Sequence, residues 1–213
     1  MIGVIGGTGH LGLGLAMRWA GAGIAVVIGS RSPERAREAA ARVQAATGGG
    51  PADGMGNLEA ARAAELIVVT VPAGAHVETL TAIAAGVQGK VVIDTTVPLG
   101  SPPTSVTPLP EGSAAERTQH MLGDRARVVA AFHTVPASLL ADLTRPIDCD
   151  VLVCGDDAAA KARVVELAQA TGARAVDVGA LQQAHTLERL TALLVSAGRR
   201  VRRHELGIRI TGL

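Results

Sequence analysis

The sequence contains no tyrosine and has one phenylalanine, one tryptophan and two lysines, Lys90 and Lys161, among its 213 residues. Short-chain dehydrogenases move the alcohol proton with a Tyr-x-x-x-Lys pair, so the absence of tyrosine excludes that mechanism. Nucleic-acid sites that stack bases need aromatic side chains, and these are almost absent here. With a net charge of +1, the chain also has no global field that would attract nucleic acid or an anionic membrane.

Cysteine and long apolar runs are also scarce. Cys149 and Cys154 are the only cysteines, and their spacing fits neither a zinc site nor a disulfide framework. We therefore expect no bound metal and a reduced, cytoplasmic setting. No stretch reaches 18 uninterrupted apolar residues, and the amino terminus has neither a basic region nor a cleavage site. We expect no membrane span and no signal peptide.

The first residues carry the strongest motif. Met1–Ile5 is an apolar run, and the glycine-rich segment Gly6–Gly12 follows at once, ahead of a helical pattern. A strand, a glycine turn and a helix in this order form a dinucleotide pyrophosphate site. We expect Gly7 to make the tight turn, Gly9 to let backbone approach phosphate, and Gly12 to allow close packing of helix on strand. The helix N-terminus then offers free N–H groups to the anion.

The second strand, Ile24–Ile28, indicates which nicotinamide cofactor binds. A carboxylate about 20 positions beyond the glycines would bind the ribose hydroxyls of NAD. This chain instead has Ser30 and Arg31, with Arg35 one helical turn further on. A hydroxyl and two guanidinium groups would bind the 2′-phosphate of NADP, so we predict NADP(H) over NAD. The alternative is that both arginines are ordinary solvated charges at a helix start.

Strands and helices alternate along the whole chain, which predicts an α/β protein with a Rossmann-like, doubly wound parallel sheet and helices on both faces. Further strands are predicted at Ala52–Met55, Leu66–Val71, Lys90–Asp94, Arg127–Phe132, Asp150–Cys154 and Arg174–Val178. Helices are predicted after a Ser32 cap, after an Asn57 cap, after Pro72, after a Ser113 capping box, over Asp156–Thr171 and over about Leu181–His204. The length allows one core with a small appended domain.

Ligands in such sheets bind at the carboxyl ends of the strands. Four strand ends are candidates: Gly6–Leu11, Ser30–Arg31, Val71–Pro72 and Phe132–Ala137. Thr96–Val97 is placed to reach the nicotinamide as well. His76 and His133 both follow strands, so we expect both to face the cleft. His133 has two interpretations: it shapes or polarises the redox partner, or it is a hydrogen-bonded residue of a turn made rigid by Pro136.

Two further segments are open to interpretation. The stretch from Thr95 to Gly112 is rich in proline, and its length is typical of a functional or mobile loop. The basic cluster Arg199–His204 lies near a helix C-terminus, where cations favour the helix dipole without any partner. The alternative is that this cluster binds an anionic tail of the second substrate.

The segments together resemble the coenzyme F420-dependent NADP oxidoreductases. The resemblance covers essentially the full length of the chain. It rests on Gly6-Gly7-Thr8-Gly9-His10-Leu11-Gly12, Gly29-Ser30-Arg31, Gly54-Met55-x-Asn57, Phe132-His133-Thr134-Val135-Pro136-Ala137, Cys154-Gly155-Asp156-Asp157 and Glu205-Leu206-Gly207-Ile208. The glycine turn is common to many enzymes, whereas the His-Thr-Val-Pro-Ala and Cys-Gly-Asp-Asp segments are much more specific.

The resemblance implies reversible hydride transfer between C4 of the nicotinamide and C5 of the deazaflavin coenzyme F420, in a homodimer. It implies an NADP-binding Rossmann domain over residues 1–140 and a small C-terminal domain over 141–213 that covers the deazaflavin and contributes to the dimer. The expected cofactor contacts, the glycines of the turn and Pro136 included, are Gly7, Thr8, Gly9, His10, Leu11, Gly12, Ser30, Arg31, Arg35, Val71, His76, Val97, Pro136 and Ala137.

A deazaflavin accepts hydride at carbon, so no protein base is required in line, and the missing tyrosine agrees with this chemistry. Catalysis would consist of holding the two rings face to face at about 3–3.5 Å. His133 is the one candidate catalytic residue, with a modest role in positioning or polarising the ring. The alternatives are an NADPH-dependent flavin or ferric reductase and a non-catalytic NADP-sensing protein.

Overall fold

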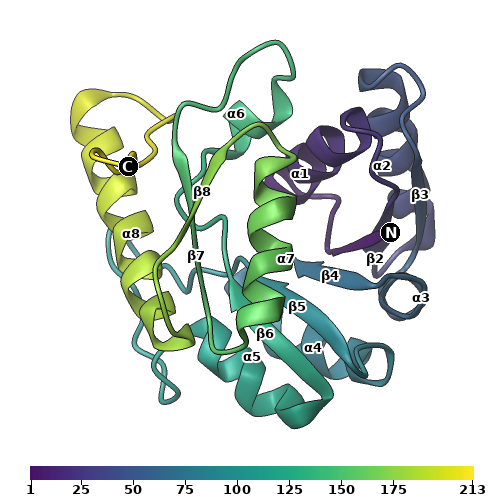
Figure 1. The fold of residues 1–213 in the computed structure, drawn as a ribbon, viewed down its shortest axis with the longest axis horizontal. Coiled ribbons are helices and arrows are strands. Elements are labelled where there is room, and N and C mark those ends of the chain that lie inside the picture. Colours follow the sequence, from purple (N-terminus) through teal and green to yellow (C-terminus); the bar gives the residue numbers. More distant parts are fainter.

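A computed structural model describes all 213 residues and contains one eight-stranded sheet (Figure 1). Its strands are β1 (Ile2–Ile5), β2 (Val26–Ser30), β3 (Ala52–Gly56), β4 (Leu66–Val69), β5 (Lys90–Asp94), β6 (Ala126–Ala130), β7 (Asp150–Gly155) and β8 (Arg174–Asp177). They are ordered β3-β2-β1-β4-β5-β6-β7-β8, and the pairs from β3 to β6 are all parallel. The predicted Rossmann-like α/β fold is confirmed.

Helices cover both faces of the sheet. They are α1 (His10–Gly21), α2 (Pro33–Ala46), α3 (Asn57–Ala63), α4 (His76–Ile83), α5 (Ala114–Leu122), α6 (Ala137–Ala141), α7 (Ala158–Gln169) and α8 (Ala184–Val201). Successive strand residues point to opposite faces. Val4 and Val68 therefore enter the core formed with α1, α2, α6 and α7. Ile5 and Ile67 enter the other core, with α3, α4 and α5.

The carboxyl-terminal part of the chain joins the same sheet in the opposite direction. β7 pairs antiparallel with β6, so the expectation of a wholly parallel sheet is wrong at this strand. A parallel return would require the chain to cross back to the amino end of β6. The connection over residues 131–149 contains only the five-residue helix α6, and the chain enters β7 from the carboxyl end of β6. The division at residue 140 stays a prediction.

The register of β7 places it largely outside the rest of the sheet. Only its last two residues, Cys154 and Gly155, pair with β6, opposite Ala130 and Val129. The first four residues of β7 therefore extend past the carboxyl end of β6, and β8 runs parallel beside them. In Figure 1, β7 and β8 rise away from β4, β5 and β6, with α8 alongside.

Several element ends differ from the predictions. The strand predicted to reach Val71 ends at Val69, and the strand predicted to reach Phe132 ends at Ala130. Phe132 has a φ of 67°, which turns the chain, and its ring packs edge-on against Trp19 at a centroid distance of 5.9 Å. The last helix is also shorter than predicted and ends at Val201.

The chain from Thr95 to Gly112 forms a loop, as predicted, with one isolated bridge between Leu99 and Val106. Ser113 caps α5 by accepting a hydrogen bond from the Glu116 N–H, also as predicted. None of the helices is long and apolar enough to span a lipid bilayer.

Candidate active site

The glycine turn after β1 is shaped by close approaches that only glycine permits. Gly6 adopts the left-handed conformation, with a φ of 71°, and the Gly7 N–H donates to the Val4 carbonyl at 3.2 Å within this turn. A Cβ on Gly7 would lie 2.7 Å from the carbonyl oxygen of Val4. A Cβ on Gly12 would lie 2.6 Å from the Cα of Gly7, so Gly12 lets α1 pack closely on the turn, as predicted.

The N-terminus of α1 is open to a ligand. Gly9 is the N-cap residue, and no side chain caps the helix. A Cβ on Gly9 would have only the Gly6 carbonyl oxygen near it, at 4.0 Å, so the space beside Gly9 is free. The first N–H groups of a helix have no partner within the helix, and they carry the positive end of its dipole. This end of α1 is therefore suited to bind an anion.

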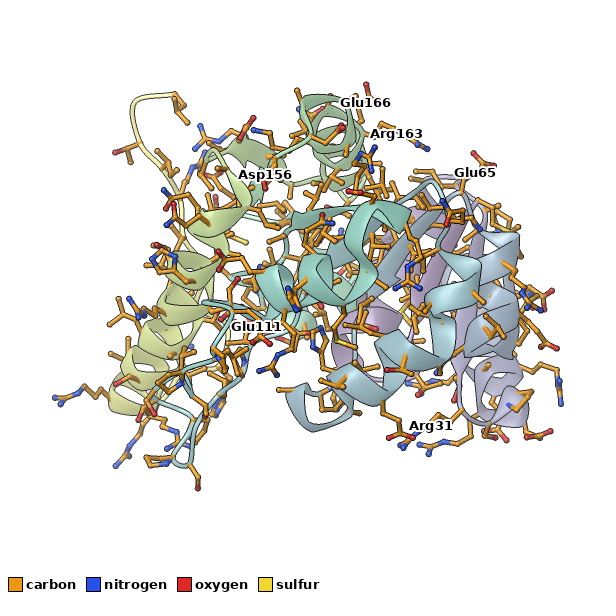
Figure 2. The ribbon with its side chains drawn as sticks, turned by 90° about the horizontal axis from the view of Figure 1, so that it is seen from below. Arg31, Glu65, Glu111, Asp156, Arg163 and Glu166 are labelled. Atoms are coloured by element: carbon orange, nitrogen blue, oxygen red, sulfur yellow. The ribbon has the colours of Figure 1, made fainter.

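A cavity of about 270 Å³ lies at the carboxyl ends of β1, β2 and β4. Its lining includes five predicted cofactor contacts: Thr8, Ser30, Arg31, Arg35 and Val71. Arg31 and Arg35 are exposed, and neither takes part in an ion pair in the structure. Figure 2 shows Arg31 at the margin of the molecule, across the view from α8. Two guanidinium groups that form no ion pair with a carboxylate of the protein favour a phosphate ligand.

Sequence reasoning did not assign four residues that line this cavity, Ser32, Asn57, Ala75 and Thr79. Asn57 was expected to cap α3, but Gly56 is the cap residue. The Asn57 side chain instead accepts a hydrogen bond from the Gly6 N–H at 3.4 Å and so supports the glycine turn. The signals in the sequence were that Asn57 directly follows the predicted strand Ala52–Met55 and belongs to the Gly54-Met55-x-Asn57 segment of the family resemblance.

A second cavity, of about 420 Å³, lies beyond the carboxyl end of β6. Its residues come from the turn after β6, from α8 and from the tail that follows α8: His133, Thr134, Val135, Pro136, Thr191, Leu194, Val195, Gly198, Arg199, Arg203, His204 and Leu206. The basic cluster thus contributes Arg199, Arg203 and His204 to a cavity that also contains His133.

A tight turn at the end of α8 brings Arg203 and His204 of the basic cluster to this cavity. Arg202 ends the helix in the left-handed conformation, with a φ of 53°. The Arg203 N–H then donates to the Gly198 carbonyl at 2.9 Å. A Cβ on Gly198 would lie 2.5 Å from the Arg203 carbonyl oxygen, so a larger residue would obstruct this turn.

His133 is buried beside the second cavity, with 7% of its surface exposed. Neither ring nitrogen has a hydrogen-bond partner, so the interpretation of His133 as a hydrogen-bonded turn residue is wrong for its ring. Its backbone carbonyl accepts from the Thr191 hydroxyl of α8 at 2.8 Å. Burial lowers the pKa of His133 to about 4, although the Asp94 charge and the backbone of Thr96 oppose this shift. At neutral pH the ring is uncharged, with one donor and one acceptor free.

Comparison with known proteins decides the family. The family described as NADP oxidoreductase coenzyme F420-dependent matches residues 1–98. The F420-dependent NADP reductase of Methanothermobacter thermautotrophicus is 43% identical over all of this chain and 95% of its own. The chain belongs to the F420-dependent NADP reductases. A solved structure provisionally assigned to the same activity, from an Arthrobacter species, has a TM-score of 0.83 at 30% identity and covers 99% of this chain and 98% of its own.

The chain also resembles part of a longer protein. Metalloreductase STEAP3 of Rattus norvegicus is 30% identical over 91% of this chain, which spans 37% of that protein. The relatives among the F420-dependent NADP reductases match over nearly their full lengths, so they agree better with the organisation of this chain.

The remaining contacts expected for an F420-dependent NADP reductase surround the two cavities without lining either. They are Gly7, Gly9, His10, Leu11, Gly12, His76, Val97 and Ala137. Six of them lie in the glycine turn, at the start of α1 or at the start of α6. Val97 is half-buried after β5. His76 is 1% exposed, so the expectation that it faces the cleft is wrong, and its contact with the cofactor stays a prediction.

Proposed function

We propose that this chain transfers a hydride reversibly between C4 of NADP(H) and C5 of coenzyme F420. The observation that carries the proposal is the pairing of two cavities along one edge of the sheet. One combines the glycine turn with Ser30, Arg31 and Arg35. The other combines the neutral His133 ring with Arg199 and with the apolar side chains of Leu194 and Val195 on α8. The rings would meet between them, over the ends of β4, β5 and β6.

The first cavity fits NADP(H). The open N-terminus of α1 would hold the pyrophosphate through backbone N–H groups, because no side chain caps it. Ser30, Arg31 and Arg35 would hold the 2′-phosphate, since a hydroxyl and two guanidinium groups are hydrogen-bond donors. No carboxylate stands at the end of β2 to bind the unphosphorylated ribose of NAD. These residues favour NADP(H) over NAD(H).

The second cavity fits a flat heterocycle with an anionic tail. The unpartnered nitrogens of His133 would be satisfied by polar edge atoms of such a ring, because each buried polar group needs a partner. Leu194, Val195 and Leu206 would pack against its faces. Arg199 and Arg203 would bind the tail. This assignment favours the substrate-binding interpretation of the basic cluster over the helix-dipole interpretation.

When bound, the two coenzymes supply the hydride and the carbon that accepts it. The protein then has to orient two rings and exclude water, and needs no acid or base in line. The chain has no tyrosine, and His133 is neutral at physiological pH, which agrees with this minimal role. We assign His133 to positioning or polarising the deazaflavin ring.

The test mixes the purified protein with NADPH and oxidised coenzyme F420 and follows the visible absorbance of the deazaflavin. NADH, FMN and ferric citrate serve as control substrates. We expect fast bleaching with NADPH and little with NADH, FMN or ferric citrate. Turnover of FMN or ferric citrate without F420 would instead support the flavin or ferric reductase. Tight NADPH binding with no acceptor turned over would support the sensor.

We also propose a homodimer in a reducing, cytoplasmic compartment, with residues 141–213 as the part that covers the deazaflavin. Leu193 and Val201 of α8 are 61% and 59% exposed, so this helix offers apolar area to a second copy. Both cysteines are free and buried. Light scattering after gel filtration tests the dimer, and Leu193→Glu should shift it to monomer if α8 forms the interface. A monomeric wild-type protein would refute the assembly.

A further inference from the structure

A buried carboxylate lies at the end of β5, between the strands whose ends lead to the two cavities. Asp94 is the last residue of β5 and is fully buried. One of its oxygens accepts from the Thr96 N–H at 2.7 Å. The other pairs with Nε2 of His76 at 2.7 Å and accepts from the Thr118 hydroxyl. His76 starts α4 and Thr118 lies on α5, so one carboxylate joins three segments.

The carboxylate is held in its charged form by these partners. Burial alone would raise the pKa of Asp94, but the hydrogen bonds and charge of His76, the Thr118 hydroxyl and the Thr96 N–H lower it. Hydrogen bonds to an ionised acceptor are about twice as strong as those between neutral groups. The three segments are therefore tied more firmly than neutral side chains would tie them.

Two of the tied segments, α4 and Thr96–Val97, border the proposed path of the nicotinamide. Ala75 and Thr79, on either side of His76, line the first cavity. Thr96 precedes Val97, the predicted nicotinamide contact. β5 is paired with β4, whose end leads to the first cavity, and with β6, whose end leads to the second. Asp94 therefore sits at the junction between the two cavities.

We propose that Asp94 is a positioning residue for hydride transfer, which holds α4, the Thr96–Val97 segment and α5 in the arrangement that aligns the nicotinamide with the deazaflavin pocket. The proposal rests on the proposed function. It does not make Asp94 a catalytic residue, because the carboxylate is buried behind the segments that would contact the cofactor. The cavity-lining residues Ala75 and Thr79 of the α4 segment and the predicted cofactor contact Val97 would all be oriented through this single group.

The consequence of losing the charge follows from the geometry. Asp94→Asn keeps the side-chain shape but has a single oxygen acceptor, so it can accept from the Thr96 N–H or from the His76 and Thr118 pair, but not from both sides. The nicotinamide end would then shift, while the cation pair at Ser30 and Arg31 stays in place. A displacement of about 1 Å in a reacting group costs up to about a hundredfold in rate. We expect a tenfold to hundredfold slower hydride transfer.

The test compares wild type with Asp94→Asn in single-turnover reactions of NADPH and 4-deuterated NADPH with coenzyme F420. Binding of NADPH and of adenosine 2′,5′-bisphosphate is measured in parallel by calorimetry. We expect hydride transfer in the single-turnover reaction to be slower in Asp94→Asn than in wild type. In steady-state assays of the same proteins, we expect the isotope effect on turnover to be larger in the variant. The Kd of NADPH should rise severalfold, whereas the Kd of the bisphosphate, which lacks the nicotinamide, should stay within about twofold.

Thr118→Val and Thr118→Ser keep the test valid if Asp94→Asn folds poorly. Thr118→Val removes one partner of the carboxylate and should show the same changes at smaller size, and Thr118→Ser should restore wild-type behaviour. Leu122→Ala is the matched control, since it removes buried apolar contacts from the same helix. It should lower the Tm without changing the isotope effect or the ratio of the two Kd values.

Unchanged transfer rates and isotope effects in Asp94→Asn and Thr118→Val would overturn the proposal. If the wild-type protein turned over no F420, the proposed function would fail, and the binding data would still decide this inference. If Asp94→Asn left the ratio of the NADPH Kd to the bisphosphate Kd unaltered, that result alone would then reject the role of Asp94.

Discussion

Glu188 should make the stability of this protein fall as the pH rises. This residue of α8 is 1% exposed, and its carboxyl accepts a hydrogen bond from the Ala114 N–H at 2.7 Å. Burial raises the pKa of Glu188 from 4.5 to about 8. The Ala114 N–H and Arg117 oppose this shift, and the charges of Asp94 and Glu116 add to it. Glu188→Gln keeps the shape and the acceptor oxygen and removes the titrating proton.

The sign and size follow from proton linkage. The folded protein holds the Glu188 proton more tightly than the unfolded chain does. Its stabilising contribution is therefore complete below pH 4.5 and is lost as the pH rises through about 8. Within that window the free energy of unfolding falls by up to about 1.4 kcal/mol for each pH unit because of Glu188. Between pH 5.5 and 7.5 the free energy of unfolding of the wild type should therefore fall by up to roughly 3 kcal/mol more than that of Glu188→Gln. This difference is large compared with a total stability of about 5–15 kcal/mol.

Urea unfolding of both proteins at pH 5.5 and pH 7.5 measures this effect. All other titrating groups are shared, so the difference between the two pH dependences isolates Glu188. We expect the wild type to lose stability relative to Glu188→Gln as the pH rises. Parallel pH dependences in the two proteins would show that Glu188 titrates near its ordinary value, and the reasoning from burial would be refuted.

Three further predictions concern single side chains. Arg31→Ala should raise the Kd of NADP about tenfold to a hundredfold and leave that of NAD unchanged, as calorimetry would show; equal losses for both would contradict the 2′-phosphate assignment. His133→Ala should lower turnover with F420 by no more than about a hundredfold in steady-state assays; a larger loss with unchanged binding would assign His133 an essential role. Trp19→Phe should cost about 1–3 kcal/mol in urea unfolding, because the buried indole donates to the Leu167 carbonyl at 2.9 Å; an unchanged midpoint would show that this bond contributes nothing.

The glycine turn and the strand pattern could be predicted from sequence because both are local. An apolar run, glycines and a helical stripe within the first 20 residues specify β1, the turn and α1 without information from elsewhere. Gly12 illustrates this, since the predicted close packing against the turn is what the structure contains. The sequence pattern did not indicate which glycine would adopt the left-handed conformation, because adjacent glycines give no signal to separate them, and the structure has it at Gly6.

The residues that sequence reasoning misjudged depend on contacts between distant segments. His76 follows β4 and was expected at the cleft, but its partner Asp94 at the end of β5 draws the ring into the interior. Asn57 starts a helix and resembles a cap, yet it binds the Gly6 N–H, 51 residues away. Arg203 and His204 of the basic cluster reach the second cavity only through the turn that ends α8. Patterns within one element cannot report which neighbour its side chains meet.

The register of β7 explains why the second cavity exists. A parallel strand in register with β6 would end level with it, and the space beyond the carboxyl edge would be open to water. Because β7 pairs through Cys154 and Gly155 alone, the rest of β7 and all of β8 stand beyond that edge. The 18 residues of α8 continue for about 27 Å and carry Arg199 to the rim. The reversal of one strand thus places α8 beside the open sheet edge, where this helix forms one wall of the second cavity.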